Sequence, residues 1–366
     1  MLVKNVINFY IKILNNIFIF FIFIFFLSSS VFCYEPYSHI KKYNSLSFNK
    51  NKFYRYSSSE LYVMSGKAIY KKTISIMEKE FEFSGKFKSK GFVINDKYLV
   101  IYGLNNIEII NRQNGEIISE KKFTDNIILR PLIYLNSLFI CLDYDTIVSI
   151  DILSGNLNWQ YKNDVFNLQL HTNTKFIQSE NYLFYINSNR MHMIEKETGL
   201  MYDRISVAPR HKNATILKNP RIACIELYND VLYICYDDGI LLAFDTKISS
   251  FLWQNDFSGI KNFIVYKRHI LAVRENGLIS LISKVNGAVL LDYSNLIGKN
   301  LKKIILLNNK GRFLILGDKS IFVFTLYNKK LYFGDQIFIK TDDIIKTSCR
   351  SFFLLSKNKI LKEYIF

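Results

Sequence analysis

The sequence is poor in the residues that build metal sites, disulfide frameworks and flexible loops. Its 366 residues include only 4 Pro, 15 Gly, 5 Cys, 5 His and 2 Trp. So little Pro and Gly excludes a low-complexity chain. The cysteines form no C-x-x-C pair and the histidines no H-x-x-x-H pair, which argues against a zinc site. Serine-hydrolase elbows, P-loops and EF-hand loops are also missing, so the sequence predicts no catalytic residues, no cofactor and no metal.

What the chain does contain is enough apolar surface for a large core. Apolar residues make up 49% and charged residues 22% of the sequence, a balance typical of globular folds. The formal net charge is +17, and about half of this excess lies in the first 75 residues, which hold ten basic and two acidic residues. The other basic residues are spread along the chain and not gathered in one stripe. We therefore expect no nucleic-acid partner.

The first 33 residues resemble a secretory signal peptide. Lysines precede an apolar run of eleven residues, 17–27, and small residues follow it. The run is too short to span a bilayer comfortably, so we expect cleavage after Ser30 or Cys33 and no membrane span in the mature chain. An uncleaved signal anchor stays open as an alternative. Acylation of Cys33 is rejected because Phe32 stands where lipoproteins have a small residue.

Residues 34–73 predict a basic, disordered leader. The segment sets eight basic residues against Glu35 and Glu60, is rich in Ser, Asn and Tyr, and keeps no apolar period. A plain linker and a transit peptide both stay open, since transit peptides are basic, rich in Ser and poor in acids. A signal followed by such a stretch resembles the two-part leader of proteins sent to a secondary plastid. We expect the ER lumen, secretion or a secondary plastid as the destination.

A unit of about 40 residues recurs six times after this leader. Each copy has a short apolar strand, a polar turn, an alternating second strand, a turn with Gly or a polar substitute, and a third strand that ends in a bulky residue. The clearest copies read SIDILSGNLNW (149–159) and AFDTKISSFLW (243–253). The turn positions 115, 155, 199, 249, 287 and 329 lie 38 to 50 residues apart. This period is typical of four-stranded β-propeller blades.

The residues that recur in this unit have structural explanations. They are Gly115, Gly155, Gly199 and Gly287 at the turn, Asp151 and Asp245 before it, and Trp159 and Trp253 at the end of the unit. A tight hairpin requires the positive φ that Gly tolerates, and the carboxylates accept local backbone N–H bonds. The tryptophans have the area to fill the space between blades. Because all of these recur with the repeat, we interpret them as structural residues and not as catalytic ones.

The signature, which has the form Ala-Φ-Asp-x-x-Thr-Gly-x-x-Φ-Trp, resembles the quinoprotein-type repeat of the PQQ-like β-propeller superfamily over roughly residues 90–366. The resemblance implies the fold and says little of activity. The superfamily includes quinone-dependent dehydrogenases, the outer-membrane assembly scaffold lipoprotein, and the propeller of the largest subunit of the ER membrane protein insertion complex. The resemblance implies that a quinone enzyme of this superfamily would carry an adjacent cysteine pair, and this sequence has none. The resemblance therefore favours the non-enzymatic members.

The repeat predicts an all-β fold, a seven-bladed β-propeller of four-stranded antiparallel blades in residues 74–366. Six units begin near residues 91, 130, 175, 221, 261 and 301, and a seventh near 343 stops one strand short. The alternating segment 74–83 precedes the first unit. It is expected to supply the missing outer strand, so that an N-terminal strand closes the last blade and removes an open edge. Six or eight blades stay open as alternatives.

The candidate partner loop is the segment 206–219, in the longest interval between copies. Its basic residues are Arg210, His211, Lys212 and Lys218, and Asn213 begins the one glycosylation sequon after the signal. Loops on a rigid scaffold usually carry recognition. An unselected insertion explains the segment equally well.

These features favour a non-enzymatic β-propeller scaffold that mediates protein-protein interactions, as a monomer within a larger assembly of unknown protein partners. The expected location is a secretory-pathway lumen or a plastid. One alternative is a quinone- or metal-dependent oxidoreductase, which would bind added cofactor. The other is a divergent propeller subunit of the ER membrane protein insertion complex, against which stands the lack of that family's C-terminal domain and membrane anchor.

Overall fold

The computed structural model describes residues 39–41, 52–55, 60–65, 68–73, 79–84, 86–162, 174–187, 190–207, 221–257, 259–341, 343–346, 351–356 and 359–365. The chain divides into two compact units, residues 1–39 with 366 and residues 40–365. Every described residue except His39 belongs to the second unit, which is built of strands and turns. Within the described stretches no helix is long and apolar enough to cross a membrane.

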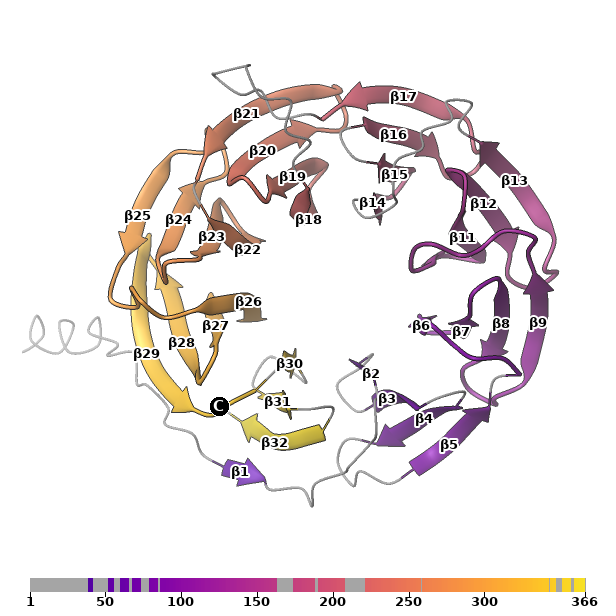
Figure 1. Ribbon diagram of the computed structural model, residues 1–366, viewed down its shortest axis with the longest axis horizontal. Helices are drawn as coiled ribbons and strands as arrows, with labels where there is room; N and C mark the ends of the chain where they lie inside the picture. The colour runs from indigo at the N-terminus through magenta and orange to yellow at the C-terminus, as the bar shows by residue number, and fades with distance from the viewer. Residues whose placement is uncertain are drawn as a thin grey trace, which may run out of the picture. The chain divides into compact units, whose positions relative to one another are not determined.

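The described strands form eight four-stranded sheets, which stand around a ring in the unit of residues 40–365 as the blades of a β-propeller (Figure 1). Blade 1 contains β2 (Lys52–Arg55), β3 (Glu60–Ser65), β4 (Ala68–Thr73) and β5 (Lys79–Ser84); blade 2 contains β6 (Gly91–Ile94), β7 (Tyr98–Tyr102), β8 (Asn106–Asn111) and β9 (Ile117–Lys122); blade 3 contains β10 (Leu132–Tyr134), β11 (Ser137–Leu142), β12 (Thr146–Asp151) and β13 (Leu157–Lys162). Blade 4 contains β14 (Thr174–Gln178), β15 (Tyr182–Asn187), β16 (Arg190–Glu195) and β17 (Met201–Ser206); blade 5 contains β18 (Ile222–Tyr228), β19 (Val231–Tyr236), β20 (Ile240–Asp245) and β21 (Ser250–Asp256). Blade 6 contains β22 (Ile260–Tyr266), β23 (His269–Arg274), β24 (Ile279–Ser283) and β25 (Val289–Tyr293); blade 7 contains β26 (Leu301–Asn308), β27 (Arg312–Gly317), β28 (Ser320–Tyr327) and β29 (Lys330–Phe338); blade 8 contains β30 (Asp343–Lys346), β31 (Ser351–Ser356), β32 (Lys359–Ile365) and β1 (His39–Lys41).

The repeat located seven of these blades. Each predicted start lies within two residues of an observed first strand. The count of seven is not confirmed, because the described strands form an additional sheet, blade 1. Its strands β2, β3 and β4 fall in the segment 34–73, so the expectation of a disordered leader is wrong for those residues. Tyr62, Met64 and Ile69 of this blade are buried and pack against the core of blade 2.

The last blade is completed by an N-terminal strand, but not by the expected one. The segment 74–83 was predicted to pair with the C-terminal strand. Instead β5 pairs with β4 as the outer strand of blade 1, because β2 to β4 give it a sheet of its own. The strand beside β32 is β1, whose Ile40 and Lys41 belong to the unit of residues 40–365. The inner strands β2 and β30 are in contact where the ring closes.

The turns and connections of the blades lie on two opposite faces of the ring. On the turn face, the hairpin after the first strand is tied to the hairpin after the third, as where the Ile152 N–H donates to the Asn136 carbonyl at 2.8 Å. On the loop face, the turn after the second strand is tied to the connection between blades. There the Asp237 N–H donates to the carbonyl of Arg221 at 2.8 Å.

A recurring set of side chains joins neighbouring blades. Trp159 of β13 donates its indole N–H to the Lys196 carbonyl of blade 4 at 2.8 Å. The ring lies against Gly199, where a Cβ atom would come within 2.5 Å of the indole. The Lys196 ammonium in turn lies 3.3 Å from the ring centroid of Tyr134 in blade 3, a cation–π contact. Burial lowers the pKa of Lys196 to about 8. Each blade therefore contributes a side chain that contacts the other, Trp159 from blade 3 and Lys196 from blade 4.

Blades 5 and 6 repeat this contact with equivalent residues. Trp253 donates to the Lys284 carbonyl at 2.9 Å and lies against Gly287. The Lys284 ammonium lies 4.0 Å from the ring centroid of Tyr228. Between blades 2 and 3 Ser119 takes the tryptophan's place, and its hydroxyl donates to the Ile152 carbonyl at 3.2 Å. The residue at the end of the repeat unit therefore forms a hydrogen bond to the next blade along the ring in these three pairs of blades.

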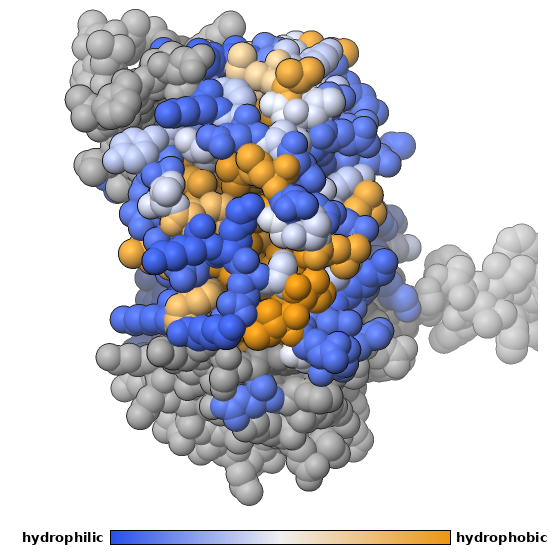
Figure 2. Space-filling view, turned by 90° about the vertical axis from the view of Figure 1, so that its right-hand side faces the viewer, coloured by the Kyte–Doolittle hydropathy of each residue, from blue (hydrophilic) through white to orange (hydrophobic). Residues whose placement is uncertain are grey.

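The outer strands face solvent and are mixed in polarity. Figure 2 shows the side of the molecule that lies at the right of Figure 1, where apolar side chains are scattered among hydrophilic ones. Ile117 of β9 and Leu157 of β13 are both nearly half exposed. Apolar side chains scattered in this way are common on soluble proteins, so this side of the ring indicates no site.

Candidate interaction face

The recurring residues of the sequence lie at hairpin turns and blade contacts of the turn face. The four glycines, Gly115, Gly155, Gly199 and Gly287, have φ angles of 78°, 70°, 74° and 67°. Asp151 accepts hydrogen bonds from the Ser154 N–H and hydroxyl, both at 2.8 Å, and these bonds lower the pKa of its carboxyl. Asp245 accepts from the N–H groups of Lys247 and Ile248. These carboxylates cap their own hairpins.

The candidate partner loop, with Arg210, His211, Lys212, Lys218 and the sequon at Asn213, lies outside the described residues. The described ends of the connection are on the loop face. The Val207 carbonyl accepts a hydrogen bond from the Tyr236 hydroxyl, and the Arg221 N–H donates to the Asp237 carboxylate at 2.9 Å. The connection therefore leaves and re-enters the ring on the same face.

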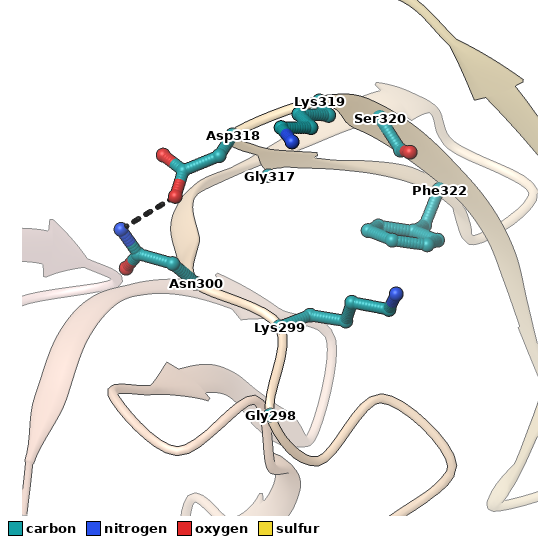
Figure 3. Close-up of a pocket in the computed structure, with 8 residues that line it drawn as sticks. All are labelled: Gly298, Lys299, Asn300, Gly317, Asp318, Lys319, Ser320 and Phe322. Carbon is teal, nitrogen blue, oxygen red and sulfur yellow. Dashed lines mark hydrogen bonds between the residues drawn. The ribbon is translucent and has the colours of Figure 1, made fainter.

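A pocket of about 200 Å³ opens on the loop face, between the connection that enters blade 7 and the turn between β27 and β28. It is lined by Gly298, Lys299, Asn300, Gly317, Asp318, Lys319, Ser320 and Phe322. Figure 3 shows the connection with Lys299 below and the turn with Lys319 above, and the ring of Phe322 at the level between them. The glycine turn 276–277 of blade 6 holds the connection, because the Gly298 N–H donates to the Asn276 carbonyl at 3.0 Å.

The charges around this pocket are unequal. Asp318 is the only acidic residue of the lining, and its carboxylate accepts from Lys302 at 2.9 Å and from Asn300 at 3.0 Å. These bonds lower the pKa of the Asp318 carboxyl, with that from Lys302 as the largest cause. The ammonium groups of Lys299 and Lys319 make no hydrogen bond or ion pair with any part of the chain that the structure describes. The pocket thus keeps two cations that no described residue compensates.

A buried polar network joins blades 3 and 4. The Asp145 carboxylate accepts a hydrogen bond from the Tyr185 hydroxyl. The Asn187 amide donates to both of its oxygens, at 2.9 and 3.1 Å. Tyr161 and His192 share a hydrogen bond of 2.9 Å between the hydroxyl and Nδ1. Burial raises the pKa of Tyr185 and lowers that of His192 to about 4, with Arg204 adding to the second effect. The network fixes the contact between two blades and contains no charged histidine at neutral pH.

This histidine predicts a dependence of stability on pH. Its folded pKa of about 4 lies below the usual 6.5, so the unfolded chain binds more protons between these values. The contribution to stability is full above pH 6.5 and is lost as the pH falls toward 4, by about 3 kcal/mol. Urea unfolding at several pH values should show a shallower acid slope in His192→Gln than in the unmodified chain.

His269→Gln is the matched control, because His269 is partly exposed and its pKa is lowered less. It should change the acid slope less than His192→Gln does. Glu226 acts in the opposite sense, since burial raises its pKa to about 7 and its contribution is lost as the pH rises. An unchanged acid slope in His192→Gln would contradict the assignment.

The pocket lysines were not singled out by the sequence. Lys299 and Lys319 stand twenty positions apart, in a chain with 48 basic residues, and nothing local separates them from ordinary surface lysines. The available signal was the pair of glycines beside them, Gly298 and Gly317. Gly298 has a φ of 83° and nothing within 4 Å of its Cβ position, whereas a Cβ on Gly317 would crowd Phe322.

Comparison with known proteins agrees with this architecture. Residues 65–292 match the family model described as outer membrane protein assembly factor BamB. The chain matches no curated protein in sequence. Among solved structures it is similar to BamB from Moraxella catarrhalis, at 13% identity and a TM-score of 0.68, with 90% of this chain and all of that chain covered.

Two further structures share the fold alone. The computationally designed Ika8 protein is 12% identical with a TM-score of 0.67, covering 88% of this chain and 98% of its own. Hsv2 from Kluyveromyces lactis is also 12% identical, with a TM-score of 0.54 over 79% of this chain and 100% of its own. The family match covers more than half of the sequence and overlaps with the repeat. The chain therefore belongs to the family described as outer membrane protein assembly factor BamB, among the PQQ-like β-propellers.

Proposed function

We propose that the chain is a non-enzymatic scaffold that holds protein partners on its loop face, in a secretory-pathway lumen or a secondary plastid. The family's description as an assembly factor supports a role in a larger protein assembly. The signal-like N-terminus supports the location.

One observation carries the proposal: the recurring residues form contacts between blades, whereas the connections between blades differ in length. Trp159, Trp253, Lys196 and Lys284 all contact the neighbouring blade. By contrast, the connections on the loop face range from three residues, 257–259, to fifteen, 207–221. A rigid ring with connections of unequal length is the arrangement in which loops usually carry recognition.

The test uses the full chain fused at its C-terminus to a proximity-labelling ligase in its native cell. We expect the fusion in a lumen or plastid and a reproducible set of labelled neighbours. The control is the same ligase carried by residues 1–38 alone, which hold the signal-like segment and precede the first described strand. Labelling that is the same for both, or a diffuse cytosolic fusion, would contradict the proposal.

A further inference from the structure

We propose that the loop-face pocket of blade 7 binds an acidic side chain of a partner peptide, together with an apolar residue beside it in the partner. This inference rests on the proposed scaffold function and gives the chemistry of its partner. The pocket is the one lined by Lys299, Lys319 and Phe322, between the connection 294–300 and the turn 317–320.

The size of the pocket selects side chains over larger ligands. Its volume of about 200 Å³ is below the roughly 300 to 1,000 Å³ of most small-molecule sites. The backbone leaves room at the entrance, since the Cβ position of Gly298 meets no atom within 4 Å. One or two side chains of a docked segment fit such an opening.

The charge of the pocket selects a carboxylate. Lys299 and Lys319 approach the opening from different segments, the connection and the turn (Figure 3). The one acid of the lining, Asp318, already accepts bonds from Lys302 and Asn300, and Asn300 also accepts from Lys261 at 2.8 Å. A carboxylate placed between these two ammonium groups, which no described residue pairs, gains charge-assisted hydrogen bonds. The neighbouring lysines add a positive potential that attracts an acidic segment.

Exposed apolar residues that neighbour the pocket lining in sequence and in register select the residue beside that acid. Ile297, which precedes Gly298, is 62% exposed, and Phe338 of β29 is 80% exposed. Phe338 pairs in register with Ser320 of the pocket lining. Two large exposed apolar residues next to residues of a basic pocket match an acidic residue followed by an apolar one, because the apolar neighbour would cover surface now in water.

The experiment measures binding of a defined probe to the purified chain by fluorescence anisotropy. The probe is a fluorescein-labelled peptide, Gly-Ser-Leu-Asp-Glu-Phe-Ser-Gly. We expect the double variant Lys299→Glu/Lys319→Glu to weaken binding at least about tenfold. The matched control is Lys310→Glu/Lys330→Glu, two exposed lysines of the same blade at its turn face. It carries the same change in net charge and should bind within about twofold of the unmodified chain.

Peptide variants separate the parts of the proposal. Replacing Asp and Glu of the probe by Asn and Gln should abolish binding, and replacing Leu and Phe by Ser should weaken it. No binding of the acidic probe, equal weakening in the two lysine pairs, or displacement by millimolar inorganic phosphate with no effect of Leu and Phe would overturn the proposal. If Lys299→Glu/Lys319→Glu keeps the full set of labelled neighbours in cells, the scaffold function stands and this pocket is not its binding site.

Discussion

Replacement of Trp159 by alanine is expected to lower the free energy of unfolding by about 3 to 5 kcal/mol. The indole is 9% exposed, stacks on Phe139 with ring centroids 5.8 Å apart, and donates to the Lys196 carbonyl. Its loss leaves a cavity between blades 3 and 4 and an acceptor without its donor. Urea unfolding can follow this variant by the fluorescence of Trp253, since the chain has only 2 Trp.

Trp159→Phe separates the two contributions. It keeps an aromatic ring in the space between the blades but removes the N–H, so we expect a smaller loss of about 1 to 2 kcal/mol. A loss below about 1 kcal/mol for the alanine variant would show that the blade contact does not depend on the tryptophan.

The second large effect is expected at the glycine that faces this tryptophan. In Gly199→Ala the new methyl group meets the indole at 2.5 Å, and the residue must also keep a φ of 74°. Strain of the left-handed conformation costs about 1 kcal/mol, and overpacking of a buried contact adds about 1 to 3. Chemical unfolding should therefore show a loss of roughly 2 to 4 kcal/mol.

Gly298→Ala is the control for conformation alone. Its φ of 83° is also positive, but nothing lies within 4 Å of the added methyl group, so the expected loss is about 1 kcal/mol. In the double variant Gly199→Ala/Trp159→Ala the clash disappears. Its loss in the free energy of unfolding should therefore be smaller than the sum of the losses of the two single variants. Equal losses of stability in Gly199→Ala and Gly298→Ala would show that the Trp159 indole moves aside without cost.

Much of the fold could be predicted because the repeat expresses one physical requirement many times. Gly155 and Trp159 recur at fixed spacing as Ser249 and Trp253, each serving a hairpin or a blade contact. Blade 1 escaped prediction for a related reason: it lacks the turn glycine and the terminal Trp. Its buried pair Tyr62 and Met64 shows the two-residue period of a strand, but lysines around them suggested a solvated leader.

The pocket could not be predicted, because its chemistry depends on the three-dimensional neighbourhood of unremarkable residues. Lys299 lies in a connection and Lys319 in a turn, and either alone is an ordinary surface lysine. Only the fold shows that Asp318 is compensated by Lys302, which leaves the other two ammonium groups without a partner among the described residues. The sequence pattern of β29 likewise does not reveal that Phe338 is exposed.

The pairing of β1 with β32 affects how the chain folds during synthesis and where it can be trimmed. The blade that seals the ring needs residues from both ends of the chain, so a nascent polypeptide cannot finish folding until its last strand has been synthesised, and joining such distant segments is slow. The same pairing limits proteolytic maturation. Trimming ahead of His39 leaves the seal intact, whereas trimming at residue 73 would remove β1 together with three strands of blade 1.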